Sequence, residues 1–506
     1  MSNKLYKNIF IVVFGFSFFN LVSCKKALDL KSTQYATEEL QWKTISDTRS
    51  SLMGVYGLFR AALVNNNAHW LWGELREGDF KPYRRSDFEA ISNGNLNASF
   101  PLMKDLTNWR RFYAIINSAN ILIERAPEVM ANDPKYTESN LKLDIAQARA
   151  LRAFAYFYMV RIWGDVPLIT SSHDNGSFVE KPRTDKEIVL SYAERELLEA
   201  AEDLPYLYGV SPTAYYGEFE TRWNGVLITK NSAYAILTHI AAWQGRYIDV
   251  DVYSEFVMNN YAKSKISYQT IAQLTQASGF FSGKNAAQVV AFGAVDDFNE
   301  SSAGGHIEQL TLAAPIVLKQ YPELYVPKDS IPKIFNDPQN KDVRFGLDTL
   351  SGLYKTNYFI NYSGTTPIFN KIKVIRGGTT DGDYAVFGSA LVFTRLEDIV
   401  LLRAEAFAVL GRREESIRLL NIVRNSRSLN SYNTDSKEDL VDEIFAERRR
   451  ELMGEGHRWY DQVRYHKIKK TNPDFNRLIK EGGIYWPISE DVLSNNSMIV
   501  QNSYWK

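Results

Sequence analysis

The stretch Arg403-Ala-Glu-Ala-Phe-Ala-Val-Leu-Gly411 decides the fold class of this 506-residue chain. It closes a helical pattern that runs over residues 396–410, and Gly411 separates that pattern from a second one over residues 414–427. Glycine often follows the last residue of a helix, because it adopts the left-handed conformation that the turn requires. The two segments therefore predict a hairpin of two packed helices.

Further amphipathic helices are predicted on the N-terminal side of this hairpin and directly after it. Apolar side chains recur three or four positions apart in each, which is the spacing of one helix face. Paired helices with short Gly or Pro breaks resemble tetratricopeptide units, but no strict period of roughly 34 residues runs through the chain. We therefore expect an all-α fold of degenerate tetratricopeptide-like repeats. The predicted helices cover residues 108–125, 141–163, 186–204, 231–244 and 438–454.

Two regions, about 65–102 and 261–391, interrupt the helical pattern. Both are rich in Gly, Asn, Ser and aromatic residues. The second also contains short strand-like runs between turn signals, at residues 288–292, 369–375 and 385–393. Long irregular segments on a regular frame commonly carry function. We expect these two regions to form a large irregular portion that binds a ligand.

The N-terminus predicts export. Residues 1–8 carry Lys4 and Lys7 without an acid, residues 9–22 are almost wholly apolar, and Ser23 is small. This order is typical of a secretory signal peptide. A transmembrane helix would need roughly 20 apolar residues, and this run is shorter.

Cys24 predicts a lipid anchor. Leu21-Val22-Ser23-Cys24 resembles the bacterial lipobox, in which the cysteine carries the lipid, and no other cysteine exists in the chain. An ordinary signal peptide that happens to contain a cysteine is the alternative. We expect a signal peptide at 1–23, the lipidated cysteine and a tether at 24–43, and one domain at 44–506. Several acyl chains on one cysteine would give a stable membrane anchor.

Composition limits the partners of the chain. Lys and Arg together number 59, as do Asp and Glu; removal of Lys4 and Lys7 leaves 57 bases against 59 acids, a net charge of −2. This balance does not favour nucleic acid as a partner. The 10 Trp, 29 Tyr and 28 Phe fit thick helix packing together with an aromatic binding surface.

Sequence motifs for catalysis and for metal or phosphate binding are absent. The six His show no metal-ligand spacing, and no G-x-S-x-G motif occurs. The segment Gly279–Asn285 is one residue short of a phosphate loop and ends without a hydroxyl. Thr380–Asp383 could touch calcium, but it reads more simply as a tight turn. We predict a protein that is not an enzyme and needs no cofactor or metal.

The charged run Glu447–Asp461 crowds acids, arginines and a histidine together, as an active site does. Glu447 with Arg450, and Arg448 with Glu451, are opposite charges three positions apart, so they can pair along one helix. We therefore interpret the run as a structural ion network.

The same run resembles the C-terminal signature of the SusD/RagB family of Bacteroidetes outer-membrane lipoproteins, in which E-R-x-R-E-L-x-x-E-G-x-R precedes an aromatic residue and an Asp. Other segments are similar to the family in the same order along the chain. They are residues 147–158, Trp163-Gly-Asp-Val-Pro-Leu168, the positions Trp109, Asn117 and Asn120, and Tyr485–Ser489 with Asn495, Gln501 and Asn502.

The resemblance implies an all-α fold of four tetratricopeptide-like units and a less regular ligand-binding portion. Members of the family are not enzymes; they act at the cell surface as lids on a SusC-like TonB-dependent transporter and capture oligosaccharides, or peptides in some members. We therefore expect a glycan-binding lipoprotein of the outer membrane that faces the outside. A peptide-binding lid is the first alternative, and a secreted hydrolase the second.

The candidate ligand contacts come from the two irregular regions. Trp70 and Trp72 are two positions apart, so in an extended loop after Asn65–Asn67 they would face the same way. Ordinary packing is the alternative interpretation for every candidate. The candidates are Trp70, Trp72, Arg76, Asp79, Tyr83, Asn93, Asn95, Phe280 and Tyr321, with Phe88, Phe281, Tyr325, Tyr354 and Tyr358 as further aromatic candidates.

Overall fold

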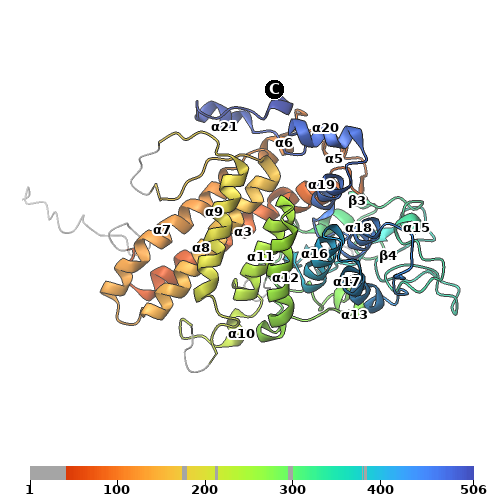
Figure 1. Cartoon of the computed structure of the whole chain (residues 1–506), viewed down its shortest axis with the longest axis horizontal. Coiled ribbons are helices and arrows are strands. Elements are labelled where there is room, and N and C mark those ends of the chain that lie inside the picture. Colours follow the sequence, from red (N-terminus) through yellow and green to blue (C-terminus); the bar gives the residue numbers. More distant parts are fainter. Residues whose placement is uncertain (1–40, 174–178, 211–214, 295–299, 379, 381–383) are drawn as a thin grey trace, which may run out of the picture. The chain divides into compact units, whose positions relative to one another are not determined.

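Long helices packed side by side form the frame of the protein, a computed structural model of which is drawn in Figure 1. Each long helix contacts the next long helix along the chain, so helices that are neighbours in the frame are also neighbours in the sequence. The expected all-α fold of tetratricopeptide-like helices is confirmed. The helices of the frame are α3 (Ile45–Val64), α7 (Arg110–Asn132), α8 (Glu138–Trp163), α9 (Lys186–Asp203), α11 (Lys230–Gln244), α12 (Tyr247–Asn260), α16 (Leu396–Val409) and α17 (Arg413–Ser426).

The structure describes residues 41–173, 179–210, 215–294, 300–378, 380 and 384–506. Residues Thr44–Lys506 make up one compact unit. The predicted signal peptide, Cys24 and the first part of the tether lie outside the described residues, as do Asp381–Asp383 of the predicted turn. Among the described helices, none combines the length and the apolar character needed to cross a bilayer.

Helix α8 lies in the middle of the N-terminal half of the frame. Its sequence predicted a single apolar stripe, but every residue from Ala150 to Trp163 is buried. The reason is that α8 packs between α7 and α9, so both of its flanks face other helices. Alanine at positions 150, 153 and 155 lets those neighbours approach closely.

The helical hairpin predicted around Gly411 is present. Gly411 has a φ of 77°, in the left-handed region, and this turn reverses the chain between α16 and α17. Apolar residues of both helices meet in one cluster that includes Val400, Phe407 and Leu420. Sequence reasoning missed α3 and α12, and it ended α7 seven residues before Asn132.

The main hydrophobic core lies where the helices meet a two-stranded sheet. Strand β2 (Val290–Phe292) pairs antiparallel with β8 (Leu391–Thr394). The Phe292 ring stacks on Phe59 of α3, with centroids 4.8 Å apart, and Phe393 meets Phe154 of α8 edge-on at 4.7 Å. The second irregular region is thus fastened to the frame through its strands.

The remaining elements are short and belong mostly to the irregular regions. Three further antiparallel pairs join β1 (Lys81–Pro82) to β3 (Leu324–Tyr325), β4 (Phe359–Ile360) to β5 (Ile368–Phe369), and β6 (Ile375–Arg376) to β7 (Val386–Phe387). The other helical segments are η1 (Asn65–Asn67), α4 (Ala68–Trp70), η2 (Leu71–Leu75), α5 (Ser86–Ser92), α6 (Pro101–Leu106), α10 (Glu220–Trp223), η3 (Tyr261–Ser264), α13 (Ile271–Thr275), α14 (Ile307–Thr311), α15 (Ile331–Ile334), α18 (Leu440–Glu451), α19 (Arg458–Lys469), α20 (Pro473–Glu481), α21 (Glu490–Asn495) and η5 (Ser503–Trp505).

Candidate functional site

Trp70 and Trp72 are core residues, which corrects the prediction that they lie together in an extended loop. They sit in consecutive helical turns, α4 and η2, so residues two apart point in different directions. The Trp70 indole N–H donates to the Gly454 carbonyl and the Trp72 indole N–H to the Leu106 carbonyl, each at 3.2 Å. Only 4% and 3% of the two side chains are exposed. Neither indole presents a face to solvent.

The preceding asparagines explain why the sequence was misread. Asn66 and Asn67 both have a positive φ, 54° and 55°, and asparagine tolerates this left-handed conformation better than most residues. Their polarity therefore reflects a sharp turn into α4. The amide side chain of Asn67 bonds to Gln309 at 2.9 Å, so even this polar stretch is tied to the irregular region that follows.

Arg76 and Asp79, the two predicted partners of a sugar hydroxyl, are also in the interior. Arg76 donates to the carbonyls of Gly483 (2.7 Å) and Ile484 (3.2 Å). Asp79 accepts from Arg449 at 2.9 Å, and although burial alone would raise its pKa, this arginine holds the pKa below its usual value. Both side chains serve contacts within the protein, and neither is free for a ligand.

Several predicted aromatic contacts are buried as well. Phe280 is 1% exposed, and its ring packs edge-on against Phe281 at 5.1 Å. Phe88 and Tyr358 lie in the core too. Tyr354 is exposed, but its ring lies 4.4 Å from Tyr362 in a separate cluster.

Tyr83 and Tyr321, in contrast, come together at the surface. Strand β1 pairs with β3, and just beyond this pair the Tyr83 N–H donates to the Glu323 carbonyl at 2.8 Å. The ring centroids of Tyr83 and Tyr321 are 4.8 Å apart at an angle of 33°. Tyr321 is 37% exposed and Tyr83 is half-buried. We call these two side chains the tyrosine platform; it joins the two irregular regions that the sequence singled out.

Charged side chains hold the backbone around the tyrosine platform. Arg85 donates to both carboxylate oxygens of Asp87, at 2.9 and 2.8 Å, and also pairs with Glu323. Lys319 pairs with the other oxygen of Glu323 at 3.0 Å. The neighbouring Arg84 lies over the Tyr83 ring, 5.1 Å from its centroid. Sequence reasoning missed all of these residues, although the Arg84-Arg85 pair directly follows the predicted Tyr83.

Asn93 and Asn95, which were also predicted, are exposed just after α5. Helix α5 has seven residues, Ser86–Ser92, which corresponds to about 10 Å of rise. The amides therefore lie beyond the far end of a short helix whose near end follows Tyr83. Their backbone N–H groups are bonded to carbonyls of α5, so the loop that carries them is fixed to the helix.

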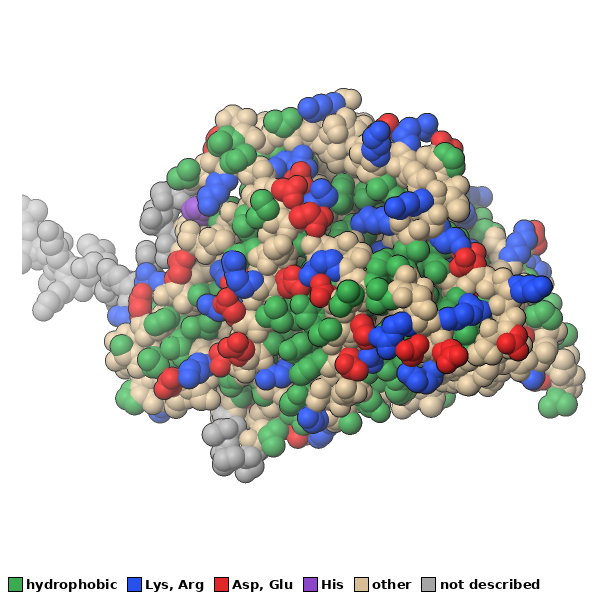
Figure 2. Space-filling view, viewed as in Figure 1, with side chains coloured by type: hydrophobic (Ala, Val, Ile, Leu, Met, Phe, Trp, Pro, Cys, Tyr) green, Lys and Arg blue, Asp and Glu red, His purple; other side chains and the backbone are tan. Residues whose placement is uncertain are grey.

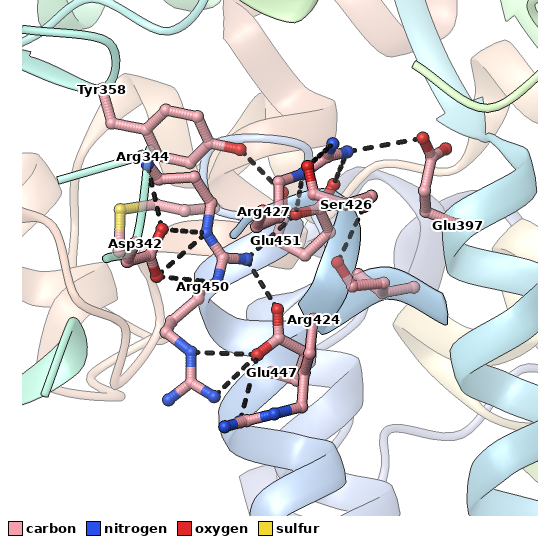
Figure 3. A network of polar contacts seen from close by, with 12 residues as sticks. Asp342, Arg344, Tyr358, Glu397, Arg424, Ser426, Arg427, Glu447, Arg450 and Glu451 are labelled. Atoms are coloured by element: carbon pink, nitrogen blue, oxygen red, sulfur yellow. Dashed lines mark hydrogen bonds and ion pairs between the residues drawn. The ribbon is translucent and has the colours of Figure 1, made fainter. Parts of the chain in front are cut away.

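The charged run at the C-terminus is a buried ion network (Figure 3). The carboxylate of Glu451, on α18, meets three guanidinium groups: Arg427 at 2.7 Å, Arg395 at 2.8 Å and Arg344 at 3.0 Å. All four side chains are at most 1% exposed. Although burial alone would raise the pKa of Glu451, the guanidinium groups hold it well below its usual value. Every charge here has a partner, which agrees with the structural interpretation.

One of the two ion pairs predicted along this helix is different. Glu447 and Arg450 pair at 2.7 Å, as expected. Arg448 does not pair with Glu451; it bonds to Asp398 at 2.8 Å and to Asp461 at 2.9 Å. The two side chains leave α18 toward different neighbours, because each finds a better-placed partner in another element.

A pocket lies between α7 and α21. This pocket has a volume of about 450 Å³, within the range typical of small-ligand sites. Its walls are mainly apolar, and asparagine and charged side chains stand among its lining residues. The lining includes Trp109, Tyr113, Ile116, Asn117, Pro167, Ile169, Asn495 and Ile499.

No group of three or more His, Cys, Asp or Glu side chains among the described residues could hold a metal ion. The buried carboxyl group of Glu308 is engaged in contacts within the protein. Burial raises the pKa of Glu308 to about 7, but its oxygens accept from the Val374 N–H and the Ser389 hydroxyl, inside the protein.

Known proteins that resemble the chain agree with one another. Residues 360–505 match a family described as the SusD family, and residues 83–241 match one described as starch-binding and associating with the outer membrane. A crystal structure of a SusD superfamily protein from Bacteroides thetaiotaomicron is 51% identical, with a TM-score of 0.84 over 92% of this chain and 100% of that one. The SusD-like protein P38 of Formosa agariphila is 26% identical over 99% of both chains. A crystal structure of another SusD homolog from B. thetaiotaomicron is 24% identical with a TM-score of 0.76, covers 92% of this chain and 100% of that chain, and supports the fold alone.

Proposed function

The chain belongs to the SusD family of outer-membrane-associated binding proteins, and from that membership we propose that it captures an oligosaccharide at the cell surface. The tyrosine platform carries this proposal. Two tyrosine rings lie against each other at the surface, with polar and charged groups around them. A sugar ring offers C–H groups that pack on an aromatic face and hydroxyls that hydrogen-bond to the rim.

The tyrosine platform also favours glycan capture over catalysis. Binding on an open surface needs aromatic faces and hydrogen-bonding groups, whereas hydrolysis needs two carboxylates at a set separation. The carboxylates nearest the platform, Asp87 and Glu323, are both engaged by Arg85. A secreted hydrolase remains the alternative from the sequence, and turnover of a bound oligosaccharide would reveal it.

Peptide capture is the alternative that a specific observation favours. The pocket between α7 and α21 has mainly apolar walls and polar groups among its lining residues. Such a pocket fits a peptide. One of its apolar side chains would lie against the apolar walls, and its backbone amides would bond to the asparagines. The tyrosine platform and this pocket lie on different elements, so the two functions can be told apart by substitution.

We further propose that the captured ligand passes to a SusC-like TonB-dependent transporter. The proposal rests on the family, and the surface of the helical frame is compatible with a partner. Ile188 on α9 and Ile248 and Val252 on α12 are 58%, 69% and 56% exposed. Exposed apolar side chains on neighbouring helices favour protein contact when they form one patch.

The anchor proposal rests on Cys24, the lone cysteine. Replacement of Cys24 by Ala should release the protein from the outer membrane or leave it unprocessed, because no second thiol can take the lipid. Fractionation of cells that express either form measures this. A variant that stays in the membrane fraction like the wild type would contradict the lipid anchor.

The proposed function is tested with arrays of oligosaccharides and of peptides, probed with the purified full-length protein in detergent. We expect retention on oligosaccharides and loss of that retention in the Tyr83→Ala/Tyr321→Ala double variant. Retention on peptides alone, unaffected by this double variant, would show that the peptide alternative is correct.

A further inference from the structure

Arg84 has an unusual backbone conformation beside the tyrosine platform. Its φ is 55°, in the left-handed region, where a residue with a side chain is disfavoured by about 1–2 kcal/mol. The conformation is held on both sides: the Tyr83 N–H bonds to the Glu323 carbonyl, and Arg85 bonds to Asp87. The turn has a clear result, because Arg84 is exposed while Arg85 is half-buried.

Among the described residues, no acidic side chain pairs with Arg84. Both nearby carboxylates are already engaged, Asp87 by Arg85 and Glu323 by Arg85 and Lys319. None of the ion pairs found among the described residues involves Arg84. Its guanidinium carbon lies over the Tyr83 ring, 5.1 Å from the centroid, so the cation is part of the platform's surroundings.

The ion pairs around the platform do not include Arg84. Arg85 and Lys319 pair with Asp87 and Glu323, whereas Arg84, exposed on the same segment, pairs with no acidic side chain among the described residues. On the face shown in Figure 2, acidic and basic side chains are interspersed. Arg84 is instead an exposed guanidinium beside a half-buried aromatic ring, with no acidic partner among the described residues.

From this geometry we infer that the ligand is an acidic oligosaccharide, with a uronate carboxylate or a sulfate ester bound by Arg84. The inference rests on the proposed glycan capture and adds the charge of the ligand. A sugar ring stacked on the platform would bring a substituent on its edge within reach of the guanidinium. Arginine suits this role because its planar fork gives two parallel hydrogen bonds to a carboxylate or sulfate.

A purely structural role for Arg84 makes different predictions. A surface arginine over a tyrosine ring can contribute a modest cation–π attraction and nothing more. In that case its replacement would not change which ligands bind. Ligand preference therefore separates the two roles, whereas stability does not.

The test compares matched pairs of saccharides that differ only in charge, such as tetragalacturonate with its methyl ester and sulfated with desulfated galacto-oligosaccharides. The full-length protein in detergent is measured by titration calorimetry as wild type, Arg84→Gln and Arg84→Lys. Arg477→Gln, at an exposed arginine on α20, is the matched control. We expect the wild type and the control to bind the charged member of a pair at least about tenfold more tightly. Arg84→Gln should lose this preference, and Arg84→Lys should keep part of it.

Salt gives a second readout. The preference for the charged member should shrink at 0.5 M NaCl, because exposed charges are screened over a few ångströms at high ionic strength. Equal affinity for both members, or an unchanged preference in Arg84→Gln, would overturn the acidic ligand and leave glycan capture standing. Binding of acidic peptides and of no saccharide would overturn both.

Discussion

The Glu451 network and the tyrosine platform are built from the same kinds of side chain but differ in how their charges are balanced. In the network, Arg344, Arg395 and Arg427 share the carboxylate of Glu451, and all four side chains are buried. At the platform, Arg84 is exposed and has no acidic partner among the described residues. A buried charge must be paired where it lies, whereas an exposed charge can wait for a ligand. Arginine-rich segments therefore divide by burial into those that stabilise the fold and those that can bind.

The strongest test of this division is Glu451→Ala, which removes the carboxylate that three buried guanidinium groups share, although each keeps another carboxylate as partner. We expect a loss of about 3–5 kcal/mol in the free energy of unfolding, because the buried cluster is left with one positive charge that is not balanced. Urea denaturation measures this. The control is Glu415→Ala, at a surface ion pair with Arg412, which should change stability little. Wild-type stability of Glu451→Ala together with lost ligand binding would make the network a binding site.

The Trp72→Ala variant tests whether the indoles of Trp70 and Trp72 stabilise the fold, as the network does, or bind ligand, as the platform does. Because Trp72 is almost fully buried, truncation should create a cavity and cost about 3–5 kcal/mol of stability. Ligand affinity per folded molecule should stay unchanged. Phe219→Ala, at an aromatic residue that is 77% exposed, serves as the control. Normal stability together with weakened ligand binding would show that Trp72 contacts the ligand after all.

Glu308 sharpens the comparison, since it is buried and its carboxylate accepts only from a backbone N–H and a hydroxyl among the described residues. Burial raises its pKa to about 7, so the folded protein keeps a proton on it that the unfolded chain releases above about pH 4.5. Its stabilising contribution is therefore complete at low pH and is lost as pH rises through 7. We expect the free energy of unfolding of the wild type to fall between pH 5 and 7 by up to about 2 kcal/mol more than that of Glu308→Gln.

Glutamine can retain the bonds of Glu308, with its oxygen accepting from the Val374 N–H and its amide donating to the Ser389 hydroxyl. Stability curves measured in urea at several pH values decide the matter. Parallel curves for Glu308→Gln and the wild type would show that this carboxyl is ionised in both states or in neither.

At the platform we expect effects on binding with little effect on stability. Tyr83→Ala or Tyr321→Ala should weaken oligosaccharide binding by about 2 kcal/mol, roughly thirtyfold, as truncation of a central aromatic contact does. The thermal midpoint should move little, because both rings are partly exposed. Tyr354→Ala, at an exposed tyrosine of a different cluster, is the control for calorimetry. Equal weakening by the control would indicate a general loss of structure.

The helical frame was predictable because its signals are local. The spacing of the apolar residues and the break at Gly411 predict the hairpin directly. Glu447 and Arg450 are three positions apart, which allows an ion pair on one face of a helix. Partners from outside a helix were not predictable: Arg448 turned to Asp398 and Asp461, which lie 50 and 13 residues away. The spacing of charged residues along a helix shows which ion pairs can form, but tertiary packing decides which of them do form.

The site was predictable only in part, for a related reason. Each of the two irregular regions that the sequence singled out contributes one ring to the platform, and Tyr83 and Tyr321 were among the candidates. Their contact spans 238 residues, however, and depends on the pairing of β1 with β3, two strands of two residues each. Trp70 and Trp72 were misplaced because a left-handed turn at two asparagines starts a helix where a loop was expected.

The most direct test of the central claim is a crystal structure of the protein with the oligosaccharide that the array identifies. We predict one sugar ring packed against Tyr83 and Tyr321, with its edge toward Arg84. The network around Glu451 should be the same as in the free protein. An oligosaccharide bound in the pocket between α7 and α21, with the tyrosine platform empty, would contradict the account.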